Sequence, residues 1–259
     1  MNRLPLELHR LFVPQGAGPA HDPLDEADLI DAEGRVRAMV LGLGRPADWA
    51  AVSSVWQGVQ ADLGLPAPAI AVAGPSGYQL WFSVSDAVPA ALAQRFLDAL
   101  RRRYLADIAA PRLGLLPADD PTSACGWRHA APIPAPLAPT GPWSAFVAPD
   151  LAPMFSEESW LDMPPNPEGQ ADLLSRLTSI AHADFLRVLG EFSPAAPTAS
   201  TATAAAHAHG AHGAARSPTT DPRRFLIGVM NDERVDLALR IEAAKALLPA
   251  LRPSEGLQD

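Results

Sequence analysis

The stretch Gly74-Pro75-Ser76-Gly77-Tyr78-Gln79-Leu80-Trp81-Phe82-Ser83 decides the fold, because a tight turn leads directly into a strand. Pro75 supplies a fixed φ angle and Gly77 a permissive one, which is what a chain reversal requires. The short apolar run at residues 69–73 precedes the turn. The two runs on either side of the turn therefore predict a β-hairpin.

The second strand of this hairpin carries different side chains on its two faces. Alternation places Tyr78, Leu80 and Phe82 on one face. Aromatic residues on strands commonly serve packing, so this face is expected to lie against helices. Gln79 and Trp81 share the other face, where they are expected to be half exposed.

Two helices and two further strands flank the hairpin. The apolar run at 36–43 predicts a buried strand, and the recurrence of large apolar residues after Pro46 predicts a helix. A second amphipathic helix follows Pro89, and residues 112–116 predict a last short strand. The resulting order is β-α-β-β-α-β, the split arrangement of ferredoxin-like folds, and the predicted class is α+β.

The remaining sequence predicts appendages to this core, in keeping with the 28 prolines. Asn166 is expected to cap a helix that begins at Pro167 and whose apolar side extends to Leu189. Residues rich in Ala, Thr, Ser, Pro and His cannot bury enough apolar area to order themselves. The predicted divisions are an N-terminal extension at 1–35, the core at 36–120, a Pro-rich extension and helix packing on the core at 121–192, a disordered linker at 193–220 and a helical hairpin at 221–259.

The composition indicates which kinds of partner the protein can bind and in which cellular compartment it is expected. The formal net charge of -9 argues against a general affinity for nucleic acid, because phosphate binding draws on clustered cations. Cys125 is the single cysteine, which excludes an intramolecular disulfide and suits a reducing compartment. The sequence contains no run long enough to span a membrane and does not begin like a signal peptide. We therefore expect a cytoplasmic protein with no membrane partner.

The order of elements resembles the catalytic core of archaeo-eukaryotic-type primases and primase-polymerases, which hold divalent metals on two acids at the end of the first strand. Gly42 and Gly44 stand at the corresponding positions here. Gln79 stands where that family has a histidine that contacts nucleotide phosphate. Asp119 and Asp120 are the candidates for the family's third acid. The resemblance implies a core that has lost polymerase chemistry, with no catalytic residue, no metal and no other cofactor.

Two shorter resemblances point to nucleic-acid biology. The strand with Gly77, Tyr78 and Phe82 is similar to the third strand of an RNA-recognition motif, although Ser76 replaces the expected basic residue. Near the carboxyl end, the segment 221–249 resembles part of phage terminase small subunits. That resemblance covers a small part of the chain and suggests mobile-DNA biology.

A run of arginines, Arg101-Arg102-Arg103, forms the main basic cluster, with Arg95 and Arg112 nearby in sequence. Three consecutive helical residues spread over most of a turn, and Asp98 lies four residues before Arg102, where it can pair with it. The cluster therefore predicts either a solvated helix end, whose cations favour the C-terminal dipole, or a phosphate contact.

Two groups of potential metal ligands are weak candidates. His207, His209 and His212 lie in an alanine-glycine tract, where binding would be geometrically unselective. Cys125 and His129 lack two further ligands at a recognisable spacing. A buried thiol and a surface histidine are the simpler interpretation, so no metal site is predicted.

These observations leave three functional hypotheses. The first is a non-catalytic bacterial protein with a primase-like or RNA-recognition-like core, acting in nucleic-acid transactions through partners. The second is a protein-interaction adaptor that binds a protein through residues 221–259 and does not contact nucleic acid. The third is a metal-dependent nucleotidyltransferase that uses Asp119 or Asp120. The predicted contacts to single-stranded nucleic acid or to a partner are Gln79, Trp81, Arg101, Arg102 and Arg112.

Overall fold

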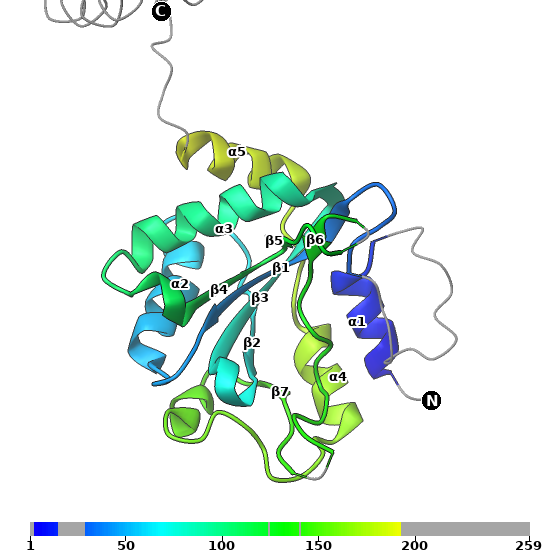
Figure 1. Ribbon diagram of the computed structural model, residues 1–259, viewed down its shortest axis with the longest axis vertical. Coiled ribbons are helices and arrows are strands. Elements are labelled where there is room, and N and C mark those ends of the chain that lie inside the picture. Colours follow the sequence, from blue (N-terminus) through cyan, green and yellow to red (C-terminus); the bar gives the residue numbers. More distant parts are fainter. Residues whose placement is uncertain (1–2, 15–28, 124, 140, 193–259) are drawn as a thin grey trace, which may run out of the picture. The chain divides into compact units, whose positions relative to one another are not determined.

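A computed structural model describes residues 3–14, 29–123, 125–139 and 141–192 (Figure 1). The predicted linker at 193–220 and the predicted helical hairpin at 221–259 lie outside the described residues, as do His207, His209 and His212. Within the described ranges, the structure contains no helix with the length and apolar character needed to cross a membrane.

The centre of the described body is a five-stranded sheet in which each pair of neighbours is antiparallel. The strand order across the sheet is β4-β1-β3-β2-β7. The class is therefore α+β, as predicted, and the sheet is compatible with a ferredoxin-like arrangement. The strands are β1 (Arg35–Leu43), β2 (Ala69–Val72), β3 (Tyr78–Pro89), β4 (Leu113–Leu116) and β7 (Ala145–Val147), and a separate ribbon pairs β5 (Ala118–Asp119) with β6 (Trp127–Arg128).

The hairpin predicted around Pro75 and Gly77 is confirmed. β2 pairs with β3 in antiparallel register, and the turn between them contains a 3₁₀ segment, Gly74–Ser76. Gly77 follows with a φ of 62°, and a Cβ atom at this residue would lie 2.1 Å from the Leu43 carbonyl oxygen. Only glycine accommodates both this backbone conformation and this close approach.

Three helices cover one face of the sheet: α2 (Trp49–Ala61), α3 (Ala90–Tyr104) and α5 (His182–Phe192). Tyr78, Leu80 and Phe82 are fully buried beneath them, which confirms the predicted packing face. The ring of Phe96 on α3 lies 5.8 Å from the ring of Phe82. The side chain of Asp48 accepts a hydrogen bond from the Ala51 amide and so caps the start of α2.

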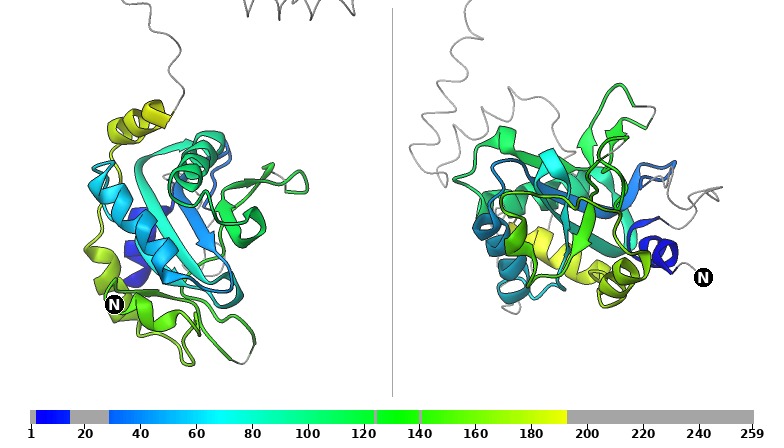
Figure 2. Two further views of the ribbon diagram at one scale, coloured as in Figure 1. Left: turned by 90° about the vertical axis from the view of Figure 1, so that its left-hand side faces the viewer. Right: turned by 90° about the horizontal axis from the view of Figure 1, so that it is seen from below.

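Two further helices, α1 (Leu4–Phe12) and α4 (Pro167–Ser175), cover the opposite face. They lie side by side, on the other side of the sheet from α2 and α3 (Figures 1 and 2). A second apolar core fills the space between these helices and the sheet. The sheet is therefore a middle layer between two layers of helices. Gln79 on this face is half-buried, as expected, but the expectation that Trp81 lies half exposed is wrong.

The helix predicted to begin at Pro167 does not continue to Leu189. Asn166 caps it as expected, because its Oδ1 accepts from the amides of Glu168 and Gly169. The helix ends at Ser175, and Ile180 then exchanges backbone hydrogen bonds with β3, donating to Ser83 and accepting from Ser85. This pairing holds the chain extended between α4 and α5, which overrides the helical periodicity of the sequence.

Arg37 connects α1 to the sheet through three backbone carbonyls. It lies at a register shift in β1, and only 8% of its surface is exposed. Its guanidinium donates to the carbonyl oxygens of Val84 at 3.0 Å, Val13 at 3.2 Å and Arg10 at 2.8 Å. Burial lowers the pKa of Arg37 from its ordinary value. Two of these carbonyls lie at the C-terminal end of α1, where a cation is favourable.

Gln170 on α4 closes the outer edge of the sheet. Its Oε1 accepts from the Phe146 amide at 2.8 Å, and its Nε2 donates to the Phe146 carbonyl oxygen at 2.9 Å. The side-chain amide thus provides the donor and the acceptor that a neighbouring strand would offer to β7. Gln170 is itself buried, so both hydrogen bonds are shielded from water.

Replacing Arg37 by methionine is expected to destabilise the protein by about 1–3 kcal/mol, because the buried carbonyls of Arg10, Val13 and Val84 lose their donor. Chemical denaturation followed by circular dichroism measures the free energy of unfolding. Arg102→Gln is the matched control, and its exposed side chain predicts a change within about 0.5 kcal/mol. Equal stability of the two variants would show that Arg37 does not anchor α1.

Gln170→Glu keeps the shape of the side chain but replaces the donor with an oxygen that faces the Phe146 carbonyl. We expect a loss of about 1–3 kcal/mol at neutral pH, because one buried hydrogen bond is replaced by a contact between two acceptors. Gln94→Glu makes the same chemical change at a half-buried residue of α3 whose side chain has no hydrogen bond to the described residues, and it should be nearly neutral. Thermal melts of the two variants provide the comparison.

Candidate functional site

Trp81 is buried, contrary to the prediction that it lies half exposed. Its indole is 3% exposed, with its ring 5.2 Å from the ring of Phe12 on α1 and 5.8 Å from the ring of Phe146 on β7. Its Nε1 donates to Gln79 Oε1 at 2.9 Å, and Gln79 is half-buried. The indole has no free face on which a nucleic-acid base could stack. Trp81 is therefore a packing residue of the second core.

The three consecutive arginines near the end of α3 are paired with acidic residues. Arg101 Nε donates to Asp98 Oδ1 at 3.0 Å, and Arg102 forms an ion pair with the second oxygen of the same carboxylate. Arg103 lies 3.4 Å from the carboxylate of Asp62 on the neighbouring helix end. The pair of Asp98 with Arg102 was expected from their spacing and is confirmed. Much of the positive charge of this cluster is offset locally.

The tyrosine that follows these arginines is part of the same contact. The Tyr104 hydroxyl donates to Asp62 Oδ2 at 3.0 Å. Burial, together with this hydrogen bond to a carboxylate, raises the pKa of Tyr104 to about 12. The ring packs against Gly58 of α2, where a Cβ atom would lie 2.3 Å from the ring. This end of α3 therefore has a clear structural role.

Arg112 directly precedes β4 and contacts the loop after β1. Its side chain donates to the Pro46 carbonyl oxygen at 2.6 Å, and its own carbonyl oxygen accepts from the Gly44 amide at 2.7 Å. Its Nε is buried without a hydrogen-bond partner. The predicted contact residues therefore form two separate pairs. Gln79 contacts Trp81, and Arg101 shares the Asp98 carboxylate with Arg102. Within the described residues, no hydrogen bond or ion pair joins one pair to the other or joins Arg112 to either pair.

Gly42, which the resemblance to primases predicts at a metal-ligand position, lies on a strand between two neighbouring strands. Gly42 on β1 pairs with Gln79 on β3 and with Gly114 on β4. Asp120 lies in a turn, where its carboxylate accepts hydrogen bonds from the amide and hydroxyl of Thr122, and these lower the pKa of Asp120. No group of three potential metal ligands among His, Cys, Asp and Glu occurs within the described ranges.

Cys125 is exposed, contrary to the interpretation of a buried thiol. Its sulfur lies 3.2 Å from the Ser123 hydroxyl and donates to the Trp127 carbonyl oxygen. These contacts belong to the turn between β5 and β6. The thiol is therefore part of a local turn that stabilises this small ribbon.

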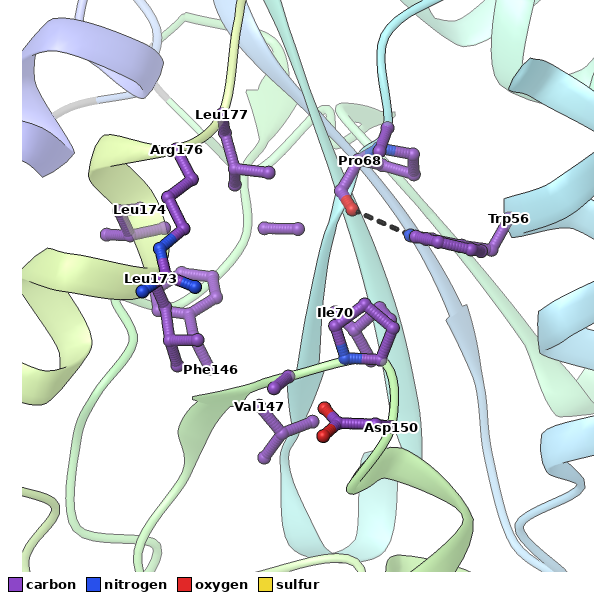
Figure 3. Close-up of a pocket in the computed structure, with 14 residues that line it drawn as sticks. Trp56, Pro68, Ile70, Phe146, Val147, Asp150, Leu173, Leu174, Arg176 and Leu177 are labelled. Carbon is purple, nitrogen blue, oxygen red and sulfur yellow. Dashed lines mark hydrogen bonds between the residues drawn. The ribbon is translucent and has the colours of Figure 1, made fainter.

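A pocket of about 290 Å³ lies between α2, the β2–β7 end of the sheet and α4 (Figure 3). Figure 3 shows Trp56 and Pro68 on one side and the α4 residues Leu173 and Leu174 on the opposite side. The indole of Trp56 is held in place because its Nε1 donates to the Pro68 carbonyl oxygen at 3.1 Å. Most of the other lining side chains are apolar, including Ile70, Phe146, Val147 and Leu177.

Two charged side chains line this pocket. Arg176 follows directly after α4, and Asp150 lies in the turn after β7. Both residues are exposed, and neither side chain has a hydrogen bond or ion pair with the residues that the structure describes. The pocket therefore combines an apolar wall with one cationic and one anionic group that are available to a ligand.

Comparison with known proteins does not assign this pocket: no protein-family model and no curated protein matches the chain. Sequence reasoning also missed its residues. Trp56 is one of the large apolar residues after Pro46 that predict a helix, and the sequence around Arg176 and Asp150 contains no recognisable motif. These residues can be recognised as a site only because they lie close together in the folded protein, and they are far apart in the sequence.

Trp81→Ala is expected to destabilise the protein by about 3–5 kcal/mol, because a large aromatic side chain is removed from a closed core. Chemical denaturation measures the loss. Trp160→Ala is the control, since the Trp160 ring is half-buried beneath the guanidinium of Arg45 and should contribute less. An unchanged stability of Trp81→Ala would show that the indole does not support the second core.

Proposed function

We propose that the protein is a non-catalytic bacterial protein with a primase-like core, acting in nucleic-acid transactions through a protein partner. The core is the split β-α-β-β-α-β arrangement formed by β1, α2, β2, β3, α3 and β4, with residues 121–192 as an extension packed on it. The order of these elements in the chain and the strand order β4-β1-β3-β2 support this assignment.

The observation that carries the proposal is the closed second face of the sheet. RNA-recognition modules stack bases on aromatic side chains of an exposed sheet face. Here the aromatic residue on the second face of the sheet, Trp81, packs against Phe12 and Phe146 instead. This arrangement supports contact through the outer helices and loops, and it favours a protein partner over a direct nucleic-acid contact by the sheet.

The glycines at the end of β1 support the non-catalytic part of the proposal. Gly42 and Gly44 offer no side-chain ligand at the positions where the resembled family binds its metals. Asp120 accepts two hydrogen bonds from Thr122 within its own turn, which gives its carboxylate a structural role.

A protein-interaction adaptor outside nucleic-acid biology is the second candidate. The net charge of -9 and the pairing of Arg101 and Arg102 with Asp98 favour it, because both weaken attraction to phosphate. The two candidates share a protein partner and differ in the process that the partner serves. The predicted partner segment, 221–259, lies outside the described residues.

Binding of labelled single-stranded DNA and RNA to the purified protein tests the absence of direct contact. We expect no salt-sensitive binding at low ionic strength, because the sheet face is closed and Arg101, Arg102 and Arg103 are paired with acidic residues. A salt-sensitive shift that disappears in Arg102→Gln would contradict the proposal and assign direct contact to α3. Nucleotide incorporation with Mg²⁺ or Mn²⁺ would contradict its non-catalytic part.

Cross-linking in cells, followed by identification of the captured proteins, tests whether the partner serves nucleic-acid transactions. Enrichment of proteins of DNA replication, repair or packaging is the expected result. Reproducible capture of proteins from an unrelated process would favour the adaptor instead. A chain that ends at residue 192 shows whether the partner is bound by the described body or by the remaining residues.

A further inference from the structure

We propose that the pocket between α2, the end of β7 and α4 binds a small amphipathic monocarboxylate, with its carboxylate on Arg176 and its aromatic or branched aliphatic body against Trp56 and Ile70. This proposal does not depend on the proposed partner contact. The ligand class follows from the size, the walls and the two charges of the pocket.

The size and walls of the pocket select a small apolar body. Its volume of about 290 Å³ lies at the lower end of the range for small-molecule sites, which is roughly 300–1,000 Å³. The indole of Trp56 is fixed by its hydrogen bond to Pro68, so it offers a rigid apolar surface without a free donor. Ile70 and Leu173 complete a wall that favours one ring or one branched chain.

Arg176 supplies the recognition of a carboxylate. It provides the cationic group of the pocket lining, and its guanidinium has no ion pair or hydrogen bond within the described part of the chain. A guanidinium stays charged at physiological pH and matches a carboxylate with two parallel hydrogen bonds. The apolar walls beside it shield such a pair from water only in part, because Arg176 itself is exposed.

Asp150 limits the charge of the ligand. Its carboxylate lines the same pocket beside Val147, away from the α4 side on which Arg176 lies (Figure 3). A second negative charge on the ligand would meet this carboxylate without a compensating cation. The pocket therefore favours a single carboxylate over a phosphate or a dicarboxylate.

Ligand-detected NMR titration of the full chain with 3-phenylpropanoate tests the proposal, and 3-phenylpropanamide is the uncharged comparison. From the usual affinity per atom of small ligands, the acid is expected to bind with a dissociation constant on the order of a millimolar. The amide keeps the apolar body and loses the charge, so it should bind at least about tenfold more weakly.

Two substitutions at the pocket are expected to act in opposite directions. Arg176→Gln should weaken binding of the acid by about tenfold or more, whereas Asp150→Asn should strengthen it about two- to threefold by removing a repulsion. Binding of the amide should change little in either variant. Arg102→Gln removes an arginine outside the pocket and is the matched control. Both pocket residues are exposed, so melting temperatures close to that of the parent protein are expected.

Three results would overturn the proposal. One is the absence of detectable binding of the acid at ten times the expected dissociation constant. Another is equal binding of the acid and the amide, which would assign the pocket to neutral apolar ligands. The third is an unchanged affinity for the acid in Arg176→Gln, which would place the carboxylate elsewhere.

Discussion

The packing of the Trp81 indole between Phe12 and Phe146 is the contact on which the second layer of the structure depends. It brings together α1 from the beginning of the chain, a central strand and the last strand of the sheet. These rings bury a face that would otherwise expose apolar side chains to water. The polar groups left at the borders of this core are then satisfied by Arg37 and Gln170.

The hairpin and the first packing face could be predicted from the sequence, because local features determine them. Pro75 and Gly77 set the turn, and alternation along β3 correctly placed Tyr78 on the face beneath α2 and α3. Alternation identifies which side chains share a face but not whether another layer covers that face. The burial of Trp81 is therefore a tertiary outcome, decided by segments far away in the sequence.

The candidate pocket could not be predicted for a related reason. Trp56, Phe146 and Arg176 come from three separate elements, and each has an ordinary local explanation within its own element. By contrast, the pair of Asp98 with Arg102 could be predicted, because residues four apart on a helix are neighbours. Spacing along the helix was thus enough to predict the ion pair on α3, whereas the pocket can be recognised only when the sheet and both helix layers are in place.

The amide of Gln170 has a consequence for how copies of this protein behave in a crowded solution. An outer strand with free backbone groups can act as a template for another chain and so initiate aggregation. At the middle residue of β7, both the amide and the carbonyl are already bound to a side chain of the same molecule. A strand arriving from a neighbouring molecule would have to displace α4 first, and this protects the sheet from growing beyond its own boundary.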